Sequence, residues 1–300
     1  MELPPLARSH LARKACVALA ALGVLLMFSA CGSGGSDSSD TGTGASSGSS
    51  AVPASSLIQS GKLTICTDVP VPPFEMYNEN GELEGFEIEL GDEFGERMNL
   101  EPVWINSVFD TIIAALKSGK CDAIINDMFI TPEREAEIRQ IPYLTSGQSF
   151  MVTKGNPDGI DPTKPSTLCG KTLTTQLGGA MVPEAKEISD ECQQDGSDPI
   201  ALLQPTKFSD SLQQLQTGHA QALFFDSPTN AYYAQLQPED FEITGPILKD
   251  ETLLGIGVVN DNQPLIGEFI KQLKALQADG TYEELLSNWN LQEARVPPPQ

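Results

Sequence analysis

The chain has few of the residues from which metal sites and hydrolytic enzymes are built. Among its 300 residues are two histidines, His10 and His219, and no Cys-x-x-Cys pair. Structural zinc sites take four cysteine or histidine ligands, often from such pairs, so we expect no metal and no cofactor. His219 lies in a Thr-Gly-His-Ala turn and is predicted to be a solvated surface residue.

Basic residues are scarce as well. Lysine and arginine number 18 against 41 aspartates and glutamates, which gives a formal net charge of −23. Residues 1–30 carry a net +2, so the rest of the chain carries −25. Because nucleic acids and anionic lipid surfaces attract basic proteins, we expect neither as a partner.

The N-terminal region lacks an apolar run long enough to span a bilayer comfortably, which takes ~20 residues. The run from Ala15 to Phe28 is shorter; it follows Arg8, Arg13 and Lys14 and precedes small residues. This order is typical of a secretory signal, which we assign to residues 1–30. We therefore expect an exported protein.

The segment Met27-Phe28-Ser29-Ala30-Cys31 resembles the lipobox of bacterial lipoproteins, except that Phe28 stands where leucine is usual. In a lipobox the cysteine thiol is acylated, for example with palmitate, and becomes the new N-terminus. Stable anchoring takes more than one acyl chain. A di- or triacylated Cys31 would therefore hold the protein on the outer face of the cytoplasmic membrane. The alternative is ordinary secretion, with Cys31 incidental.

The stretch that follows has almost no apolar residues. From Gly32 to about Ser56 it is nearly all Gly, Ser, Thr, Ala and Asp, a composition that cannot bury enough apolar surface to fold. As a flexible coil of about 24 residues it would span roughly 25–30 Å. We predict a disordered tether over residues 31–56, suited to a protein that works just off a membrane.

Beyond these segments four cysteines remain, an even number that suggests disulfide bonds in an exported protein. Cys169 and Cys192 bracket one predicted strand–helix unit and form the expected pair. Cys66 and Cys121 follow by elimination. Both are predicted to lie within strands of one sheet, so their pairing stays open.

The rest of the chain, about 240 residues, has room for one large domain or two of about 100–120 residues each. Apolar residues repeat every four positions from Phe86 to Met98, which predicts an amphipathic helix. Cys121–Asn126 is almost continuously apolar, as a buried parallel strand should be. Thr131 and Pro132 are predicted to open another helix as N-cap and first-turn proline.

Strands and helices are predicted to alternate along the whole of this region. Further strands are expected at 63–67, 103–105, 150–152, 171–175, 200–203, 222–225 and 254–259, and further helices at 108–117, 209–216, 264–278 and 281–288, with one more beginning after Gly178-Gly179-Ala180. Two α/β units in succession with a late return to strand indicate two lobes with crossover strands between them.

A series of short motifs runs from Gly61 to Trp289. In chain order they are Lys62-Leu63-Thr64-Ile65-Cys66-Thr67-Asp68, Pro73-Phe74-Glu75, Gly85-Phe86-Glu87-Ile88-Glu89-Leu90, Leu116-Lys117-Ser118-Gly119-Lys120-Cys121-Asp122-Ala123-Ile124-Ile125, Ile130-Thr131-Pro132-Glu133-Arg134, Pro142-Tyr143, Gly147-Gln148-Ser149, Cys169-Gly170-Lys171-Thr172, and Asp279-Gly280-Thr281-Tyr282 with Trp289. In this combination the chain resembles the amino-acid-binding solute receptors of ABC importers, the family 3 extracellular binding proteins.

The resemblance implies a two-lobe periplasmic-binding-protein-like fold of type II, α/β in class, with two crossover strands. Lobe 1 would consist of residues 57–147 and 254–295, and lobe 2 of residues 148–253. The ligand would be held between the lobes.

The resemblance also implies that Arg134 holds the carboxylate of an amino acid. A planar guanidinium forms two parallel hydrogen bonds to a carboxylate and stays charged when buried. The ammonium group falls to Asp226, directly after the predicted strand Ala222–Phe225. The alternatives are that Arg134 is a solvated helix charge and that Asp226 is the N-cap of the next helix.

The rest of the implied ligand site comprises Asp68, Phe109, Asn126, Asp127, Phe129, Gly178, Gly179 and Ala180. The chain departs from the family's pattern at three places. Val71 replaces an aromatic residue, Phe129 replaces a hydroxyl residue, and Gly178-Gly179-Ala180 replaces a Gly-Thr-Thr turn. The backbone N–H groups of such a turn still suit a carboxylate.

The charges of this site favour a cationic ligand. Arg134 and Asp226 match the two ends of a zwitterion, which leaves Asp68 and Asp127 in surplus. Because buried carboxylates need a cation, we expect a basic amino acid; a neutral polar one such as glutamine stays open. A further alternative is that Asp68 caps its loop and Asp127 pairs with Arg134 in the empty protein.

The resemblance implies a monomeric binding protein, not an enzyme, that delivers an amino acid to an ABC permease and ATPase in the membrane. One alternative is a dehydratase-like enzyme on the same scaffold, which needs a general acid or base in the cleft. The chain offers carboxylates there but no histidine, serine nucleophile motif or metal set. Another alternative is a sensory amino-acid receptor that acts on a signalling protein.

Overall fold

The structure of the protein is a computed structural model that describes residues 50–299. The predicted signal peptide, the acylation site Cys31 and the tether up to residue 49 lie outside the described residues. The end of the predicted tether differs from the prediction, because Val52 is buried in the core and Ala54–Ser56 form a turn of 3₁₀ helix. The folded part thus begins before residue 57, since the core buries the apolar side chain of Val52.

The α-helices include short turns and longer amphipathic segments. They are α1 (Phe86–Met98), α2 (Ile112–Lys117), α3 (Pro132–Glu135), α4 (Met181–Gln194), α5 (Phe208–Gln216), α6 (Ser227–Leu236), α7 (Gln263–Asp279) and α8 (Thr281–Asn288). Within residues 50–299, no helix has the length and apolar character needed to cross a membrane.

The strands are β1 (Lys62–Thr67), β2 (Met76–Tyr77), β3 (Leu83–Glu84), β4 (Glu101–Asn106), β5 (Ala123–Ile124), β6 (Arg139–Thr153), β7 (Thr172–Thr174), β8 (Ala201–Leu203), β9 (Ala222–Asp226) and β10 (Phe241–Val258). Strands β2 and β3 pair as a hairpin. The others form one sheet in the order β4-β1-β5-β10-β6-β9-β7-β8.

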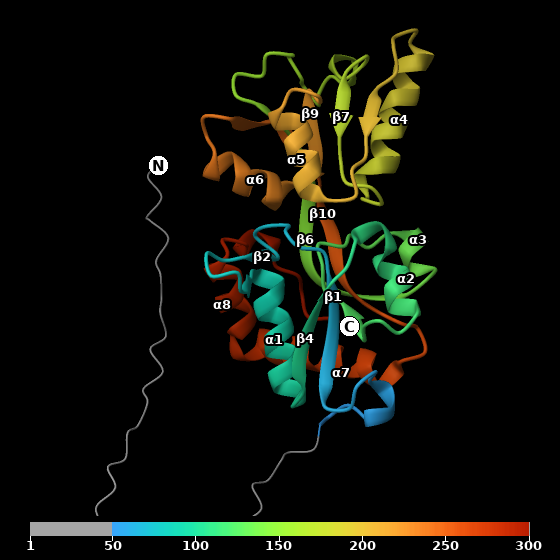
Figure 1. Cartoon of the computed structure of the whole chain (residues 1–300), viewed down its shortest axis with the longest axis vertical. Coiled ribbons are helices and arrows are strands. Elements are labelled where there is room, and N and C mark those ends of the chain that lie inside the picture. Colours follow the sequence, from blue (N-terminus) through green and yellow to red (C-terminus); the bar gives the residue numbers. More distant parts are fainter. Residues whose placement is uncertain (1–49, 300) are drawn as a thin grey trace, which may run out of the picture. The chain divides into compact units, whose positions relative to one another are not determined.

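Two parallel groups of strands are joined in this sheet by two long antiparallel strands. Strand β1 pairs in parallel with β4 and β5, and β7 pairs in parallel with β8 and β9. Strands β6 and β10 pair with each other; β10 also pairs with β5 of the first group, and β6 with β9 of the second. Figure 1 shows the two groups with their helices as two lobes, with β6 and β10 passing between them. The chain therefore has a two-lobe α/β fold with two crossover strands.

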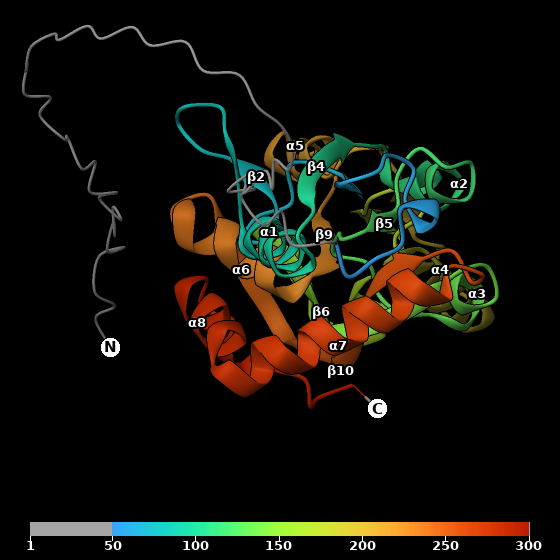
Figure 2. The ribbon, with the colours of Figure 1, turned by 90° about the horizontal axis from the view of Figure 1, so that it is seen from below.

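Helices from opposite ends of the chain complete the first lobe. Figure 2 shows α7 beneath this lobe, beside α1 and followed by α8. Phe94 of α1 packs edge-on against Phe269 of α7, with 5.1 Å between ring centroids. Arg97 of α1 donates to Asp279 at 2.7 Å and to Thr281 at 2.9 Å. These contacts bind the C-terminal helices to a helix formed about 180 residues earlier in the sequence.

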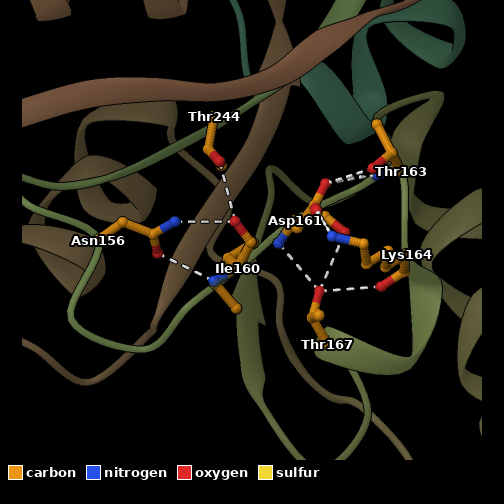
Figure 3. A network of polar contacts seen from close by, with 7 residues as sticks. All are labelled: Asn156, Ile160, Asp161, Thr163, Lys164, Thr167 and Thr244. Carbon is orange, nitrogen blue, oxygen red and sulfur yellow. Dashed lines mark hydrogen bonds and ion pairs between the residues drawn. The ribbon is translucent and has the colours of Figure 1, made fainter.

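A polar network shapes the loop that follows β6 in the second lobe (Figure 3). The Asp161 carboxylate accepts a hydrogen bond from the Thr163 hydroxyl at 2.6 Å. The Asn156 side chain bonds both the backbone N–H and the carbonyl of Ile160, at 2.9 and 2.8 Å. The Thr244 hydroxyl of β10 also donates to the Ile160 carbonyl, at 2.9 Å. The loop is therefore tied to a crossover strand.

Strand β5 is shorter than the predicted strand Cys121–Asn126. Its flanking residues bond the backbone through their side chains. The Asp122 carboxylate accepts from the backbone N–H of Thr64 at 2.9 Å, and the Asn126 side-chain oxygen accepts from the backbone N–H of Asp68. These bonds replace part of a regular ladder, so the continuous apolar run did not reveal where the strand ends.

Both cysteine pairs form disulfide bonds. Cys169 and Cys192 have Cα atoms 5.5 Å apart, and Cys66 and Cys121 have Cα atoms 5.7 Å apart. The prediction that both Cys66 and Cys121 lie within strands is wrong, because Cys121 precedes β5. Its position in the turn before the strand lets it reach Cys66 on β1.

We expect the Cys66→Ser/Cys121→Ser variant to lose stability. This bond closes a loop of 55 residues, and the chain entropy that such a closure removes from the unfolded state corresponds to about 4 kcal/mol. Urea unfolding followed by circular dichroism measures the loss. The matched control, Cys169→Ser/Cys192→Ser, opens a loop of 23 residues and should cost less, about 3 kcal/mol. A larger loss in the control would contradict the loop-length argument.

Candidate functional site

A pocket of about 300 Å³, including space open to solvent, lies between the two lobes. Both lobes contribute to its wall. Its lining residues are Val71, Phe109, Asn126, Asp127, Phe129, Arg134, Gln176, Gly179, Ala180, Met181 and Phe225.

Arg134 is placed in this pocket by the short helix α3. The Thr131 hydroxyl caps the helix by accepting from the backbone N–H of Arg134 at 3.3 Å. The guanidinium donates to the Phe129 carbonyl at 2.7 Å and to the Gly178 carbonyl of the other lobe at 3.0 Å. Its central carbon lies 5.3 Å from the centroid of the Phe109 ring, a cation–π contact. Burial lowers the pKa of Arg134 to about 10, so the group remains charged at neutral pH.

Asp68 forms a second polar contact between the lobes. It follows β1 directly, and its carboxylate accepts from the Gln176 amide at 2.5 Å and from the backbone N–H of Phe109. The same amide also donates to the Thr206 carbonyl at 3.1 Å. Burial raises the pKa of Asp68 to about 6. Neither Gln176 nor Phe109 belongs to the loop that follows β1, so these bonds join Asp68 to other segments and do not form the loop cap considered from the sequence.

Asn126 and Asp127 follow β5 and bring polar atoms to the pocket. The Asn126 side-chain oxygen also accepts from the Thr67 hydroxyl at 3.3 Å. Its amide nitrogen and the Asp127 Oδ1 atom have no hydrogen-bond partner within residues 50–299, although both side chains are at most 6% exposed. Burial, together with the nearby acids, raises the pKa of Asp127 well above its usual range despite the field of Arg134. Arg134 donates to carbonyl oxygens instead of pairing with Asp127.

The turn at Gly178-Gly179-Ala180 forms the wall of the second lobe. Gly178 has a φ of +79°, and a Cβ atom there would lie 3.0 Å from the Cα of Asp110 in the first lobe. Both the backbone conformation and the close approach therefore favour glycine. Helix α4 begins directly after Ala180, so its first turn lies at the pocket.

Asp226 is the most deeply buried of the predicted site residues, with no exposed surface. It caps α6 by accepting from the backbone N–H of Thr229 at 3.2 Å, and it also accepts from the Ser146 hydroxyl of β6. Burial raises its pKa to about 7. Its neighbour Phe225 lines the pocket, whereas Asp226 itself does not. The N-cap role considered from the sequence is thus present.

Two further acids, Glu75 and Glu87, are fully buried. Glu87 lies in the first turn of α1 and accepts from the Tyr143 hydroxyl of β6. The carboxyl groups of Glu75 and Glu87 contact each other, and Asp127 lies within electrostatic reach of both. Burial raises the pKa of Glu87 to about 7 and that of Glu75 well above its usual range. Both residues occur in quoted motifs, but the sequence did not indicate that they would meet.

Seven of the ten predicted ligand-site residues line the pocket, namely Phe109, Asn126, Asp127, Phe129, Arg134, Gly179 and Ala180. Gly178 and Asp68 do not line the pocket, but each accepts a hydrogen bond from a residue that does: Gly178 from Arg134, and Asp68 from Gln176. Sequence reasoning missed Gln176, Met181 and Phe225. Gln176 carried a usable signal, because it is a polar residue shortly after a predicted buried strand, as Asp226 is. Within the described part of the chain, no cluster of three or more histidine, cysteine or acidic residues is arranged to hold a metal ion.

Comparison with known proteins shows that the chain is similar to one protein family. The bacterial extracellular solute-binding proteins, family 3, match residues 63–292. The histidine-binding periplasmic protein of Salmonella typhimurium is 32% identical over 241 residues, which cover 76% of this chain and 87% of that protein. The lysine/arginine/ornithine-binding periplasmic protein of Escherichia coli is 32% identical over 233 residues, covering 75% and 86%.

A solved structure agrees with these sequence relatives. An ancestral arginine-binding protein bound to arginine superposes with a TM-score of 0.70 at 30% identity and covers 76% of this chain and 98% of that one. The chain belongs to the bacterial extracellular solute-binding proteins of family 3.

We expect the stability of the ligand-free protein to fall as the pH rises from 5.5 to about 7 and to level off above that. The buried Asp226 and Glu87 keep their protons up to about pH 7, whereas in the unfolded chain such groups lose them near pH 4. The folded state thus binds more protons in this range, and each retained proton corresponds to about 1.4 kcal/mol per pH unit. Thermal unfolding at constant ionic strength measures the effect as a drop in Tm of roughly 2–4 °C per kcal/mol.

The Glu87→Gln variant serves as the control for this effect, because it removes one of the two acids, Glu87 and Asp226, to which the pH dependence is assigned. Its Tm should depend less steeply on pH than that of the unaltered protein. A Tm that is constant or rises with pH between 5.5 and 7 would contradict the assignment of protonated carboxyl groups.

Proposed function

We propose that this protein is an extracytoplasmic receptor that binds a polar, preferably cationic, amino acid between its lobes and delivers it to an ABC permease and ATPase. The observation that carries the proposal is the convergence of one half-buried guanidinium, that of Arg134, with the carboxyl groups of Asp68 and Asp127 around an interlobe pocket. The names of the relatives support the ligand class, since they bind histidine, lysine, arginine or ornithine.

In this proposal Arg134 binds the ligand carboxylate. Its bonds to the Phe129 and Gly178 carbonyls use two of the five N–H donors of a guanidinium. A carboxylate that replaces the Gly178 carbonyl would meet the planar fork in a bidentate manner, a stronger pairing than a neutral acceptor provides. The start of α4 at the same wall favours a negative charge there as well.

In the same proposal, different acids bind the two positive groups of the ligand. Asp226, next in sequence to the pocket-lining Phe225, provides negative charge toward the α-ammonium, while Asp127 lines the pocket itself and has one buried oxygen without a partner within residues 50–299. The side-chain cation goes to Asp68, where it shares or replaces the Gln176 amide. Because these groups belong to both lobes, a ligand that contacts all of them binds best in the closed form.

The membrane attachment is also proposed. Acylation of Cys31 would hold the receptor on the outer face of the cytoplasmic membrane, as a monomer, with residues beyond it as a tether. We assign residues 57–147 and 254–295 to lobe 1 and residues 148–253 to lobe 2. The long strands β6 and β10, within which these boundaries fall, support that division. We propose that the ligand leaves chemically unchanged, as the relatives' names as binding proteins support.

We expect Arg134→Ala to weaken amino-acid binding at least about a hundredfold, because a charged hydrogen-bonded pair lost from a buried site costs about 3–5 kcal/mol. Isothermal titration calorimetry with the twenty amino acids and ornithine measures the change. Arg139→Ala removes an exposed arginine nearby and should bind like the unaltered protein. Unchanged affinity in Arg134→Ala would contradict the proposed site.

Asp68→Asn should shift the preference from cationic to neutral amino acids. The substitution keeps the shape of the side chain and removes its charge, so arginine or lysine should bind about ten- to a hundredfold more weakly, with glutamine little affected. The same calorimetric panel provides the measurement. Strong binding of glutamine with none of arginine or lysine in the unaltered protein would contradict the cationic preference while keeping the receptor function.

A further inference from the structure

Five buried carboxyl groups form a connected group that reaches the pocket through Asp127, and we call Asp68, Glu75, Glu87, Asp127 and Asp226 the acidic cluster. Each is at most 7% exposed. They come from five separate segments: the ends of β1, β5 and β9, the loop before β2, and the first turn of α1. Each lies within electrostatic reach of at least one other member. The fold has thus gathered acids that no local sequence feature requires to be together.

The supply of hydrogen-bond donors to the acidic cluster is uneven. Asp68 and Asp226 are each held by two donors, and Glu87 Oε1 accepts from the Tyr143 hydroxyl. In contrast, apart from the contact between Glu75 and Glu87 themselves, no N–H or O–H group within residues 50–299 reaches either oxygen of Glu75, Glu87 Oε2 or Asp127 Oδ1. Fully ionised, these oxygens would be buried charges without partners.

The positive charges that face the acidic cluster are too few to balance it. Arg134 acts on Asp127 and Lys207 on Asp68, while Asp110 adds a further acid near Asp68. Tyr143 faces the cluster from β6 as a neutral hydroxyl. Two carboxyl groups in contact in a buried site do not both ionise, so Glu75 and Glu87 hold a proton between them. The ligand-free cluster is therefore partly protonated.

We propose that the acidic cluster takes up a dibasic amino acid in exchange for protons, so that a ligand of net charge +1 is bound with proton release and a neutral ligand is not. This inference rests on the proposed amino-acid-binding function and adds its regulation by pH. The exchange is balanced, because the ligand brings one net positive charge and a protonated carboxyl group gives one proton to solvent.

The direction of the pH dependence follows from the burial of these groups. Burial raises the pKa of Asp68 to about 6 and those of Glu87 and Asp226 to about 7. A cation in contact with Asp68 or Asp127 favours their ionised forms and lowers these pKa values. Protons then leave between about pH 6 and 7. Below this range the affinity falls by up to about tenfold per pH unit for each proton released, and above it the affinity is constant.

Calorimetry at pH 6.5 in three buffers of different ionisation enthalpy tests the proposal, with arginine and its neutral isostere citrulline as probes. The slope of the binding enthalpy against the ionisation enthalpy of the buffer gives the number of protons exchanged. We expect about one proton released per arginine and almost none per citrulline, and an arginine Kd about tenfold higher at pH 6 than at pH 8. Equal arginine enthalpies in all three buffers, with a Kd independent of pH, would overturn the proton exchange and leave the receptor function standing. If no amino acid bound at any pH, both proposals would fail.

Two variants locate the source of the protons. Glu75→Gln removes one member of the buried pair without touching the pocket lining, so arginine should still bind within a few-fold while proton release falls by at least half. Should Glu75→Gln fail to fold, Glu87→Gln provides the same readout from the other member. Glu79→Gln alters an exposed acid of the neighbouring hairpin and should release as many protons as the unaltered protein. Undiminished release in a folded Glu75→Gln or Glu87→Gln variant would overturn the assignment of the released proton to the Glu75–Glu87 pair.

Discussion

Arg134 stays protonated at physiological pH, and its guanidinium is half-buried between the two lobes. An unpaired buried guanidinium costs several kcal/mol, so the surrounding structure has to provide partners. It does so with the Phe129 carbonyl from the first lobe, the Gly178 carbonyl from the second and the face of the Phe109 ring. The close approach of Gly178 to the first lobe and the tight turn at Phe109 bring two of these partners to the guanidinium.

The polar side chains around Arg134 are brought to or near the pocket by a general property of α/β sheets. Asp68, Asn126 and Gln176 each follow shortly after a parallel strand, and Asp226 is the last residue of one. The carboxyl ends of parallel strands meet at one edge, where ligands of open α/β sheets bind. Each lobe thus presents its own strand ends, and the crossover strands β6 and β10 hold the two edges face to face. The selectivity of the site then depends on which side chains occupy a few positions after the strands.

Local patterns were sufficient for most of the short elements, whereas the site residues were implied by the family resemblance. The amphipathic repeat of α1, the Thr131 cap and the residues at strand ends all depend on near neighbours in the sequence. The full length of the crossover strands was harder to predict from the sequence. Strand β6 contains buried polar residues such as Ser146, and β10 contains Gly245-Pro246, and both features interrupt the alternation of polar and apolar residues that indicates a strand. The environment of Asp226 depends on Ser146, 80 residues away, and Glu75 meets Glu87 only because the chain turns between them. Such pairings are set by tertiary packing, which a single sequence does not display.

The packing of α1 against α7 has a consequence for the order in which the chain folds. Phe94 meets Phe269, and Arg97 meets Asp279 across 182 residues of sequence, with the entire second lobe between them. The first lobe cannot complete its core until the C-terminal helices reach α1, which requires the long loop formed by the intervening segment to close. Closing so long a loop is slow compared with forming local contacts. We therefore expect the second lobe, whose elements are contiguous in sequence, to become compact first. The apolar face of α1 then becomes buried later, when α7 packs against it.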